Sequence, residues 1–155
     1  MHTIFRRIRR PVSLATRDAA GFTLIELLIT IAIVAILATI AYSTYQDFIV
    51  RSRRAAGAAC LQERAQFMER FYTTNLAYVS AAGVAAPIAQ CDAEISPHYQ
   101  IQYQVTPTAA APRVYTLRAV PQAGQATRDT ACGTLTITQA GVRGRTGAAP
   151  VTDCW

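Results

Sequence analysis

The stretch that decides the fold is GFTLIELLITIAIVAILATIAYSTY, which covers residues 21–45. Between Phe22 and Tyr42 its only charged residue is Glu26. A helix needs roughly 20 predominantly apolar residues to cross the hydrocarbon core of a bilayer. The sequence therefore predicts one membrane-spanning helical segment over residues 22–45.

The start of this stretch, Gly21-Phe22-Thr23-Leu24-Ile25-Glu26, resembles the processing site of type IV prepilins. In that family a short basic leader ends in Gly, the next residue is Phe, and the fifth residue of the mature chain is Glu. The resemblance implies that a prepilin peptidase cleaves between Gly21 and Phe22 on the cytoplasmic side and N-methylates the new terminus. The apolar helix then stays in the mature protein, whereas the shorter apolar region of an ordinary signal peptide is removed.

Glu26 is an ionisable residue near the start of the predicted span, where a charge is costly and normally has a partner. Cleavage would free the amine of Phe22. The Glu26 carboxylate of a neighbouring subunit can neutralise that amine when the helices pack together. Unpaired charges in a low-dielectric core cost several kcal/mol each, so this pairing is expected to set the axial register of assembled subunits. The alternative is an uncleaved membrane anchor that carries one stray glutamate.

Residues 1–21 are predicted to form the basic leader. They contain five arginines and one aspartate, which supply +4 of the formal net charge of +6 and leave +2 on the mature chain. Basic residues before a span indicate a cytoplasmic N-terminus under the positive-inside rule. We therefore expect a single-pass protein of the bacterial inner membrane, with a globular domain over residues 46–155 on the far side.

Four cysteines fall in this exported part, namely Cys60, Cys91, Cys132 and Cys154. None has the Cys-x-x-Cys or Cys/His spacing of a zinc site, and neither a metal nor a cofactor is expected. Two disulfides are predicted, as in proteins of an oxidising compartment such as the periplasm. The sequence allows three connectivities. Cys60–Cys91 and Cys132–Cys154 are favoured because each pair is sequential and the second closes the C-terminal loop.

The helix is expected to continue beyond the membrane, because neither Gly nor Pro interrupts it before Gly57. Over residues 46–75 the pattern becomes amphipathic, so this half of the helix should cover a sheet. Its apolar stripe is formed by Leu61, Ala65, Met68 and Tyr72. Residues 76–98, with their glycine, two prolines and many alanines, are predicted to be a loop with at most short structure.

Alternation of apolar and polar residues starts at Tyr99 and indicates strands with one buried and one exposed face. We predict strands at 99–105, 114–120 and 133–138, and a short fourth strand after Gly141. Short connections favour an antiparallel meander. The predicted fold is α+β, in which a long N-terminal helix packs on a small antiparallel sheet of three to four strands. The sheet and a C-terminal loop closed by a disulfide fill the last part of the chain.

The resemblance to type IV pilins implies the same arrangement, including a surface loop bounded by the C-terminal cysteine pair. Cys132-Gly133-Thr134-Leu135, followed by Gly141 and Cys154-Trp155, is similar to PilE-type minor pilins in particular. The leading hypothesis is therefore a minor structural subunit of a type IV pilus, which would serve adhesion, twitching motility or DNA uptake. Its implied partners are other pilin subunits, prepilin peptidase and the inner-membrane assembly machinery, and its final location is the extracellular pilus.

Enzymatic function is not expected. The sequence has no Gly-x-Ser-x-Gly elbow, phosphate-binding glycine loop or carboxylate pair with an evident purpose. It also has no lysine, which excludes Schiff-base and P-loop chemistry. His98, at a loop-to-strand junction, is most simply a solvated histidine.

Two alternatives stay open. One is a DNA-binding receptor, as in the related ComP-type minor pilins, because arginines that converge can follow DNA phosphates. The candidates are Arg113, Arg118, Arg128, Arg143 and Arg145. Scattered solvated charge is the simpler explanation for them. The other alternative is a pseudopilin of a type II secretion system, against which the two cysteine pairs and the cysteine-bounded loop weigh.

Overall fold

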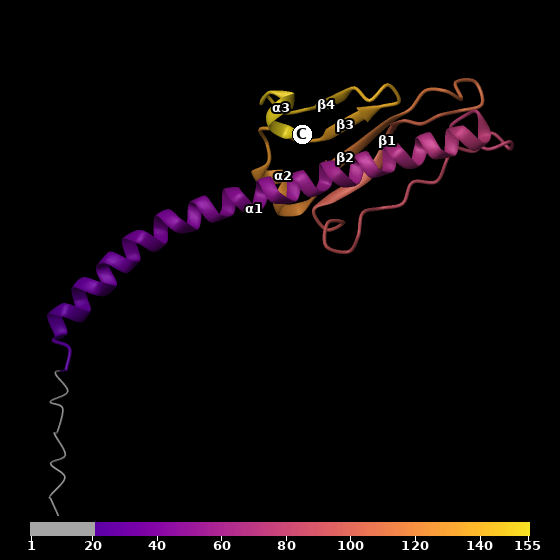
Figure 1. Ribbon diagram of the computed structural model, residues 1–155. Coiled ribbons are helices and arrows are strands. Elements are labelled where there is room, and N and C mark those ends of the chain that lie inside the picture. The colour runs from indigo at the N-terminus through magenta and orange to yellow at the C-terminus, as the bar shows by residue number, and fades with distance from the viewer. Residues whose placement is uncertain (1–20) are drawn as a thin grey trace, which may run out of the picture. The chain divides into compact units, whose positions relative to one another are not determined.

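The computed structural model describes residues 21–155 (Figure 1). The predicted leader, apart from Gly21, lies outside the described residues. The chain divides into two compact units, one up to Ile40 and one from Ala41 to Trp155. Helix α1 (Leu24–Asn75) has residues in both units. Its length agrees with the helix predicted over residues 22–75.

The unit from Ala41 onward contains a four-stranded sheet in the order β1-β2-β3-β4, in which each strand is antiparallel to the next (Figure 1). The strands are β1 (Tyr99–Val105), β2 (Thr116–Pro121), β3 (Leu135–Thr138) and β4 (Arg143–Arg145). The predicted meander is confirmed. The strand expected from residue 133 begins only at Leu135, because Gly133 has a φ of 62° and is not extended.

One face of the sheet packs against the part of α1 that belongs to the same unit. Inward side chains of the strands meet the apolar stripe of the helix there, and each fully buried Leu, Ile or Met contributes about 1.5–3 kcal/mol. The main members of this core are Ala58, Leu61, Ala65, Met68, Tyr99, Ile101, Tyr115, Leu117 and Leu135. Tyr72, the fourth residue of the predicted stripe, is half-buried beside them.

Gly57 lets α1 approach β1 closely. A Cβ atom at this position would lie 2.8 Å from Cδ2 of Tyr99, so the ring occupies the space of a side chain. The Tyr99 hydroxyl donates a hydrogen bond to Oδ2 of Asp129 at 2.7 Å. Arg54 of α1 donates from Nη1 to Oδ1 of the same carboxylate at 2.6 Å. Asp129 therefore connects the helix and the first strand through a buried, charge-paired contact.

Asp129 directly follows α2 (Ala123–Arg128), a short helix between β2 and β3 that the sequence analysis did not predict. Six residues with a glycine and no apolar stripe carry no periodic signal. Inside this helix Gln125 is buried and donates from Nε2 to the carbonyl of Val50 on α1 at 3.0 Å. A second short helix, α3 (Val151–Cys154), lies in the segment that was predicted to be a loop.

Two disulfides staple this unit, and they are the pairs that the sequence analysis favoured. Cys60–Cys91 joins α1 to the loop before β1, with a Cα–Cα distance of 5.9 Å. Cys132–Cys154 joins the start of the β3 segment to α3, with a Cα–Cα distance of 5.5 Å. Closures of such length stabilise a fold by about 3 kcal/mol in the chain-entropy model.

The loop after α1 is also fixed by tyrosines. The hydroxyls of Tyr78 and Tyr115 both donate to Oε1 of Glu69, at 2.9 and 3.1 Å. Burial, with Glu69 as the next cause, raises the pKa of Tyr78 to about 12. Burial and the same carboxylate also raise the pKa of Tyr115. The two tyrosines therefore act as neutral donors that hold the loop after α1 and the start of the β2 segment against the helix.

Candidate functional site

The residues of the predicted processing site lie just before α1. Gly21 and Phe22 precede Leu24, the first residue of the helix. The Phe22 side chain is 84 % exposed, and no atom lies within 4 Å of the place where a Gly21 Cβ would stand. The peptide bond between these two residues is therefore unobstructed by the described part of the chain.

Glu26 has a local structural role that the sequence analysis did not consider. Its backbone N–H donates to Oγ1 of Thr23 at 3.3 Å. A Thr whose hydroxyl accepts from the third residue of a helix, with Glu at that position, forms part of a capping box. The Glu26 side chain also lies in the first turn, where a negative charge is favoured by the helix dipole. The Thr-x-x-Glu spacing was visible in the sequence.

Every residue from 21 to 45 is exposed. The large apolar side chains of this segment, each more than half exposed, include Leu24, Ile25, Leu28, Ile31, Val34, Leu37 and Ile40. A helix that is apolar on all sides requires lipid or other helices around it. The described residues contain one helix, α1, that is long and apolar enough to cross a membrane by length and composition. Residues 21–45 therefore form a large apolar surface that the described part of the chain leaves uncovered.

The sheet separates the candidate arginines by face. Arg118 of β2 lies in register with Gln102 and Thr136 of the flanking strands. Because its neighbour Leu117 points to α1, Arg118 points away from the helix. On β4, Arg143 and Arg145 are opposite the inward residues of β3, so they lie on the α1 side of the sheet. One patch cannot contain all three.

The other two arginines lie elsewhere. Arg128, at the end of α2, donates to Oε1 of Gln46 on α1. Arg113 is exposed in the connection between β1 and β2. The structure therefore does not gather the five candidates into one patch.

Arg143 is the arginine that is both exposed and oriented by an aromatic ring. Its guanidinium carbon lies 5.2 Å from the centroid of Trp155. The Trp155 indole is held in turn, because Nε1 donates to the carbonyl of Gly144 at 3.0 Å. Arg118, by contrast, is half-buried and donates from Nη2 to Oε1 of Gln102 at 3.0 Å. Arg143 therefore presents a positioned cation to solvent.

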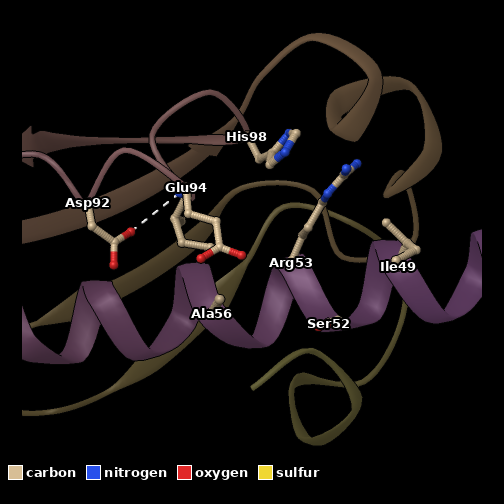
Figure 2. Close-up of a pocket in the computed structure, with 8 residues that line it drawn as sticks. Ile49, Ser52, Arg53, Ala56, Asp92, Glu94 and His98 are labelled. Carbon is tan, nitrogen blue, oxygen red and sulfur yellow. Dashed lines mark hydrogen bonds between the residues drawn. The ribbon is translucent and has the colours of Figure 1, made fainter.

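A groove of about 460 Å³ lies between α1 and the turn before β1 (Figure 2). Figure 2 shows Arg53 and His98 close together on one side of it, and Asp92 and Glu94 on the other. Burial, with Arg53 as the second cause, lowers the pKa of His98 below its ordinary value. His98 is half-buried and is thus not the fully solvated histidine that was expected. No ion pair joins these four side chains, all within the described range.

Residues 21–155 contain no group of three or more His, Cys, Asp or Glu side chains that could hold a metal ion. All four cysteines are in disulfides.

Comparison with known families decides which proteins this chain is related to. Residues 43–136, more than half of the chain, match the family described as type IV minor pilin ComP, DNA uptake sequence receptor. The chain belongs to this family of type IV minor pilins. Residues 16–42 of the minor pilin also match the prokaryotic N-terminal methylation motif, and this match includes Gly21, Phe22 and Glu26. The resemblance to type IV minor pilins stated from the sequence is confirmed.

Individual relatives of this minor pilin are pilus and fimbrial proteins. Fimbrial protein EcpC of Eikenella corrodens is 38% identical over 71 residues, which are 44% of this chain and 46% of that protein. Type IV major pilin protein PilE1 of Neisseria gonorrhoeae is 37% identical over 70 residues, which are 43% of this chain and 42% of that protein. The minor pilin therefore spans less than half the length of these curated relatives.

A solved structure also resembles it. The non-core minor pilin PilV of Neisseria meningitidis is 19% identical and has a TM-score of 0.44, with 64% of this chain and 89% of that chain covered.

Proposed function

We propose that this minor pilin is a structural subunit of a type IV pilus. Before assembly it would reside in the bacterial inner membrane as a single-pass protein with a cytoplasmic N-terminus. It would then be incorporated into the extracellular filament. The observation that carries the proposal is the exposed apolar half of α1, most of which lies within the match to the N-terminal methylation motif, residues 16–42. Lipid covers this surface before assembly, and the helices of other pilin subunits cover it afterwards.

The same proposal includes processing and assembly. Prepilin peptidase cleaves between Gly21 and Phe22 and N-methylates Phe22, and the inner-membrane assembly machinery then extracts the subunit. In the filament the amine of Phe22 pairs with Glu26 of a neighbour, because each charge alone would be costly in an apolar surrounding. The exposed positions of all three residues support this assignment.

The first test is the intact mass of the protein recovered from sheared surface filaments, with and without reduction. The expected mass begins at methylated Phe22 and rises by four hydrogens on reduction, because two disulfides are present. A full-length chain found only in the membrane would contradict the proposal, and recovery only from a periplasmic secretion complex would favour the pseudopilin alternative.

The second test separates the charge of Glu26 from its place in the helix cap. Glu26→Gln removes the charge but keeps the hydrogen bond from the backbone N–H of residue 26 to Oγ1 of Thr23. We expect this variant to accumulate in the membrane at the normal level and to be absent from filaments. The matched control is Thr23→Val, which removes the cap at a cost of about 1 kcal/mol and leaves the charge in place. Normal incorporation of the Gln variant, measured by immunoblot of sheared filaments, would overturn the pairing.

DNA binding is a second candidate function, because the matched family is described as a DNA uptake sequence receptor. The arginines cannot act as one patch, so binding would use one face of the sheet. Arg143, exposed and stacked on Trp155, favours the side on which β4 carries its arginines. Phosphate contacts of this kind are electrostatic, so the affinity should fall steeply with salt.

A mobility-shift assay with the processed full-length protein in detergent tests this function. Arg143→Gln should weaken binding and lower the slope of log affinity against log salt by about one unit. Arg118→Gln, which removes an arginine from the opposite face, is the matched control and should change neither. Absence of a shift at low salt would exclude DNA binding, and a loss with Arg118→Gln alone would assign the opposite face.

A further inference from the structure

The open edge of β1 is closed by a side chain instead of a strand. The carboxamide of Gln90 donates from Nε2 to the carbonyl of Ile101 at 2.8 Å. Its Oε1 accepts from the backbone N–H of Ile101 at 2.9 Å. One side chain thus makes the two hydrogen bonds that a residue of a neighbouring antiparallel strand would make.

The register of the sheet explains why Ile101 is available to Gln90. Next to β1, the carbonyl of His98 accepts from Gln122 N–H at 2.9 Å, so the 98/122 pair is hydrogen-bonded. Hydrogen-bonded pairs alternate along an antiparallel ladder. The backbone N–H and C=O groups of even-numbered residues in β1 therefore point to β2. Those of odd-numbered residues point to the open edge. Ile101 is the middle one of the three odd-numbered residues from Tyr99 to Tyr103.

The loop before β1 holds Gln90 in place. The neighbouring residue Cys91 is bonded to Cys60 of α1. Farther along the edge, Tyr99 N–H donates to the carbonyl of Ile95 at 2.9 Å. On the other side of Gln90, the Tyr103 hydroxyl donates to the carbonyl of Ala86 at 2.8 Å. The loop therefore follows the strand, with Gln90 as its contact to the centre of the edge.

The side chains of β1 give this edge little protection against pairing with another chain, so its cover is the loop that Gln90 anchors. Natural edge strands are kept apart by charged side chains, proline, bulges or very short length. The seven residues of β1, Tyr-Gln-Ile-Gln-Tyr-Gln-Val, contain no charge, no proline and no glycine. The one irregularity in the pairing of β1 with β2 lies at the end of the strand, between Tyr103 and Val105. Such an uncharged segment of high β propensity is typical of self-associating strands. The opposite edge, β4, has only three residues, two of them arginines.

We propose that Gln90 prevents β1 from pairing edge to edge with β1 of a second copy of this chain. Removal of its carboxamide frees one donor and one acceptor at the middle of an uncharged strand. A two-fold axis beside Ile101 would bring the same groups of two copies together, which is the self-complementary geometry of a symmetric dimer. This inference does not depend on assembly into a pilus, which uses the apolar half of α1.

The test compares variants of the full-length protein in detergent micelles by analytical ultracentrifugation and by amide hydrogen exchange. In dilute Gln90→Ala, the Ile101 amide should exchange about fivefold faster, as expected for one lost hydrogen bond. At higher protein concentration this variant should form dimers, and exchange at Ile101 should slow again. Gln104→Ala, a change of the same size at an exposed position of β1, is the matched control and should stay monomeric.

Gln90→Glu keeps the acceptor for Ile101 N–H but places a negative charge on the edge. We expect it to remain monomeric, because two such charges would face each other in the dimer. If Gln90→Ala does not fold, the shorter amide of Gln90→Asn takes its place with the same expectation of dimers. A Gln90→Ala or Gln90→Asn variant that is monomeric at every concentration would overturn the proposal. Equal dimerisation of the Glu or Gln104→Ala variants would overturn it as well.

Discussion

Replacement of Gly57 by Ala should destabilise this minor pilin, although the same change inside an exposed helix usually stabilises it by about 1 kcal/mol. The new Cβ would lie 2.8 and 2.9 Å from Cδ2 and Cγ of Tyr99. The ring cannot retreat without loss of the hydrogen bond from its hydroxyl to Asp129, at 2.7 Å. Overpacking costs about 1–3 kcal/mol, and an unsatisfied buried group costs about 1–3 kcal/mol more. After subtraction of the helix gain, the net loss should be about 1–5 kcal/mol.

The assay is guanidinium unfolding of the full-length protein in detergent, followed by the near-ultraviolet circular dichroism of its aromatic residues. The matched control is Gly124→Ala in α2, where a Cβ meets no atom within 4 Å and the midpoint should stay the same or rise. In a Tyr99→Leu background the cost of Gly57→Ala should disappear, because contacting residues couple energetically. A Gly57→Ala variant as stable as the parent, or an equal cost in the Tyr99→Leu background, would refute the reasoning.

Two further predictions concern buried polar groups. Asp129→Ala leaves Arg54 unpaired with only 12% of its side chain exposed, so the free energy of unfolding should fall by about 3–5 kcal/mol. Addition of Arg54→Met should recover part of this loss, and equal losses in the single and double variants would contradict a role for the ion pair. Alkaline pH should also destabilise the fold, because burial, followed by Glu69, raises the pKa of Tyr78 from 10.0 to about 12. As the pH rises, the Tyr78 hydroxyl therefore loses its proton in the unfolded chain before it does so in the folded protein. The contribution of Tyr78 to the free energy of unfolding is complete below about pH 10 and is lost toward pH 12, a loss of about 3 kcal/mol. Guanidinium midpoints measured together with tyrosinate absorbance check this, and midpoints that do not fall above about pH 10 would show that Tyr78 titrates normally.

Local patterns in the sequence were sufficient for most of the backbone. The apolar run from Phe22 and the stripe that contains Leu61 predicted one long helix, and alternation after Tyr99 predicted the strands in their order along the chain. These signals are local, since the side-chain periods of helices and strands repeat within a few residues. The short helix α2 was missed because Ala123–Arg128 has no such repeat.

The candidate sites depended on both levels. The processing motif at Gly21 and Phe22 could be predicted from the sequence alone, because its residues are contiguous in the chain. The prediction that arginines after Tyr99 could converge required their positions in space. The sheet register placed Arg118 and Arg143 on opposite faces, and side-chain direction depends on pairing between strands that no single strand reveals.

By itself, then, the sequence predicted the long helix and the strands of this minor pilin, their order and an apolar segment long enough to span a membrane, because each rests on residues close together in the chain. Only the tertiary structure decided that Arg54 meets Asp129, 75 residues away, and that Gly57 receives the ring of Tyr99. It also decided that Gln90 closes the edge of β1 at Ile101. Such contacts depend on how whole helices and strands pack together. The sequence around a polar or small residue does not indicate which distant residue it will contact.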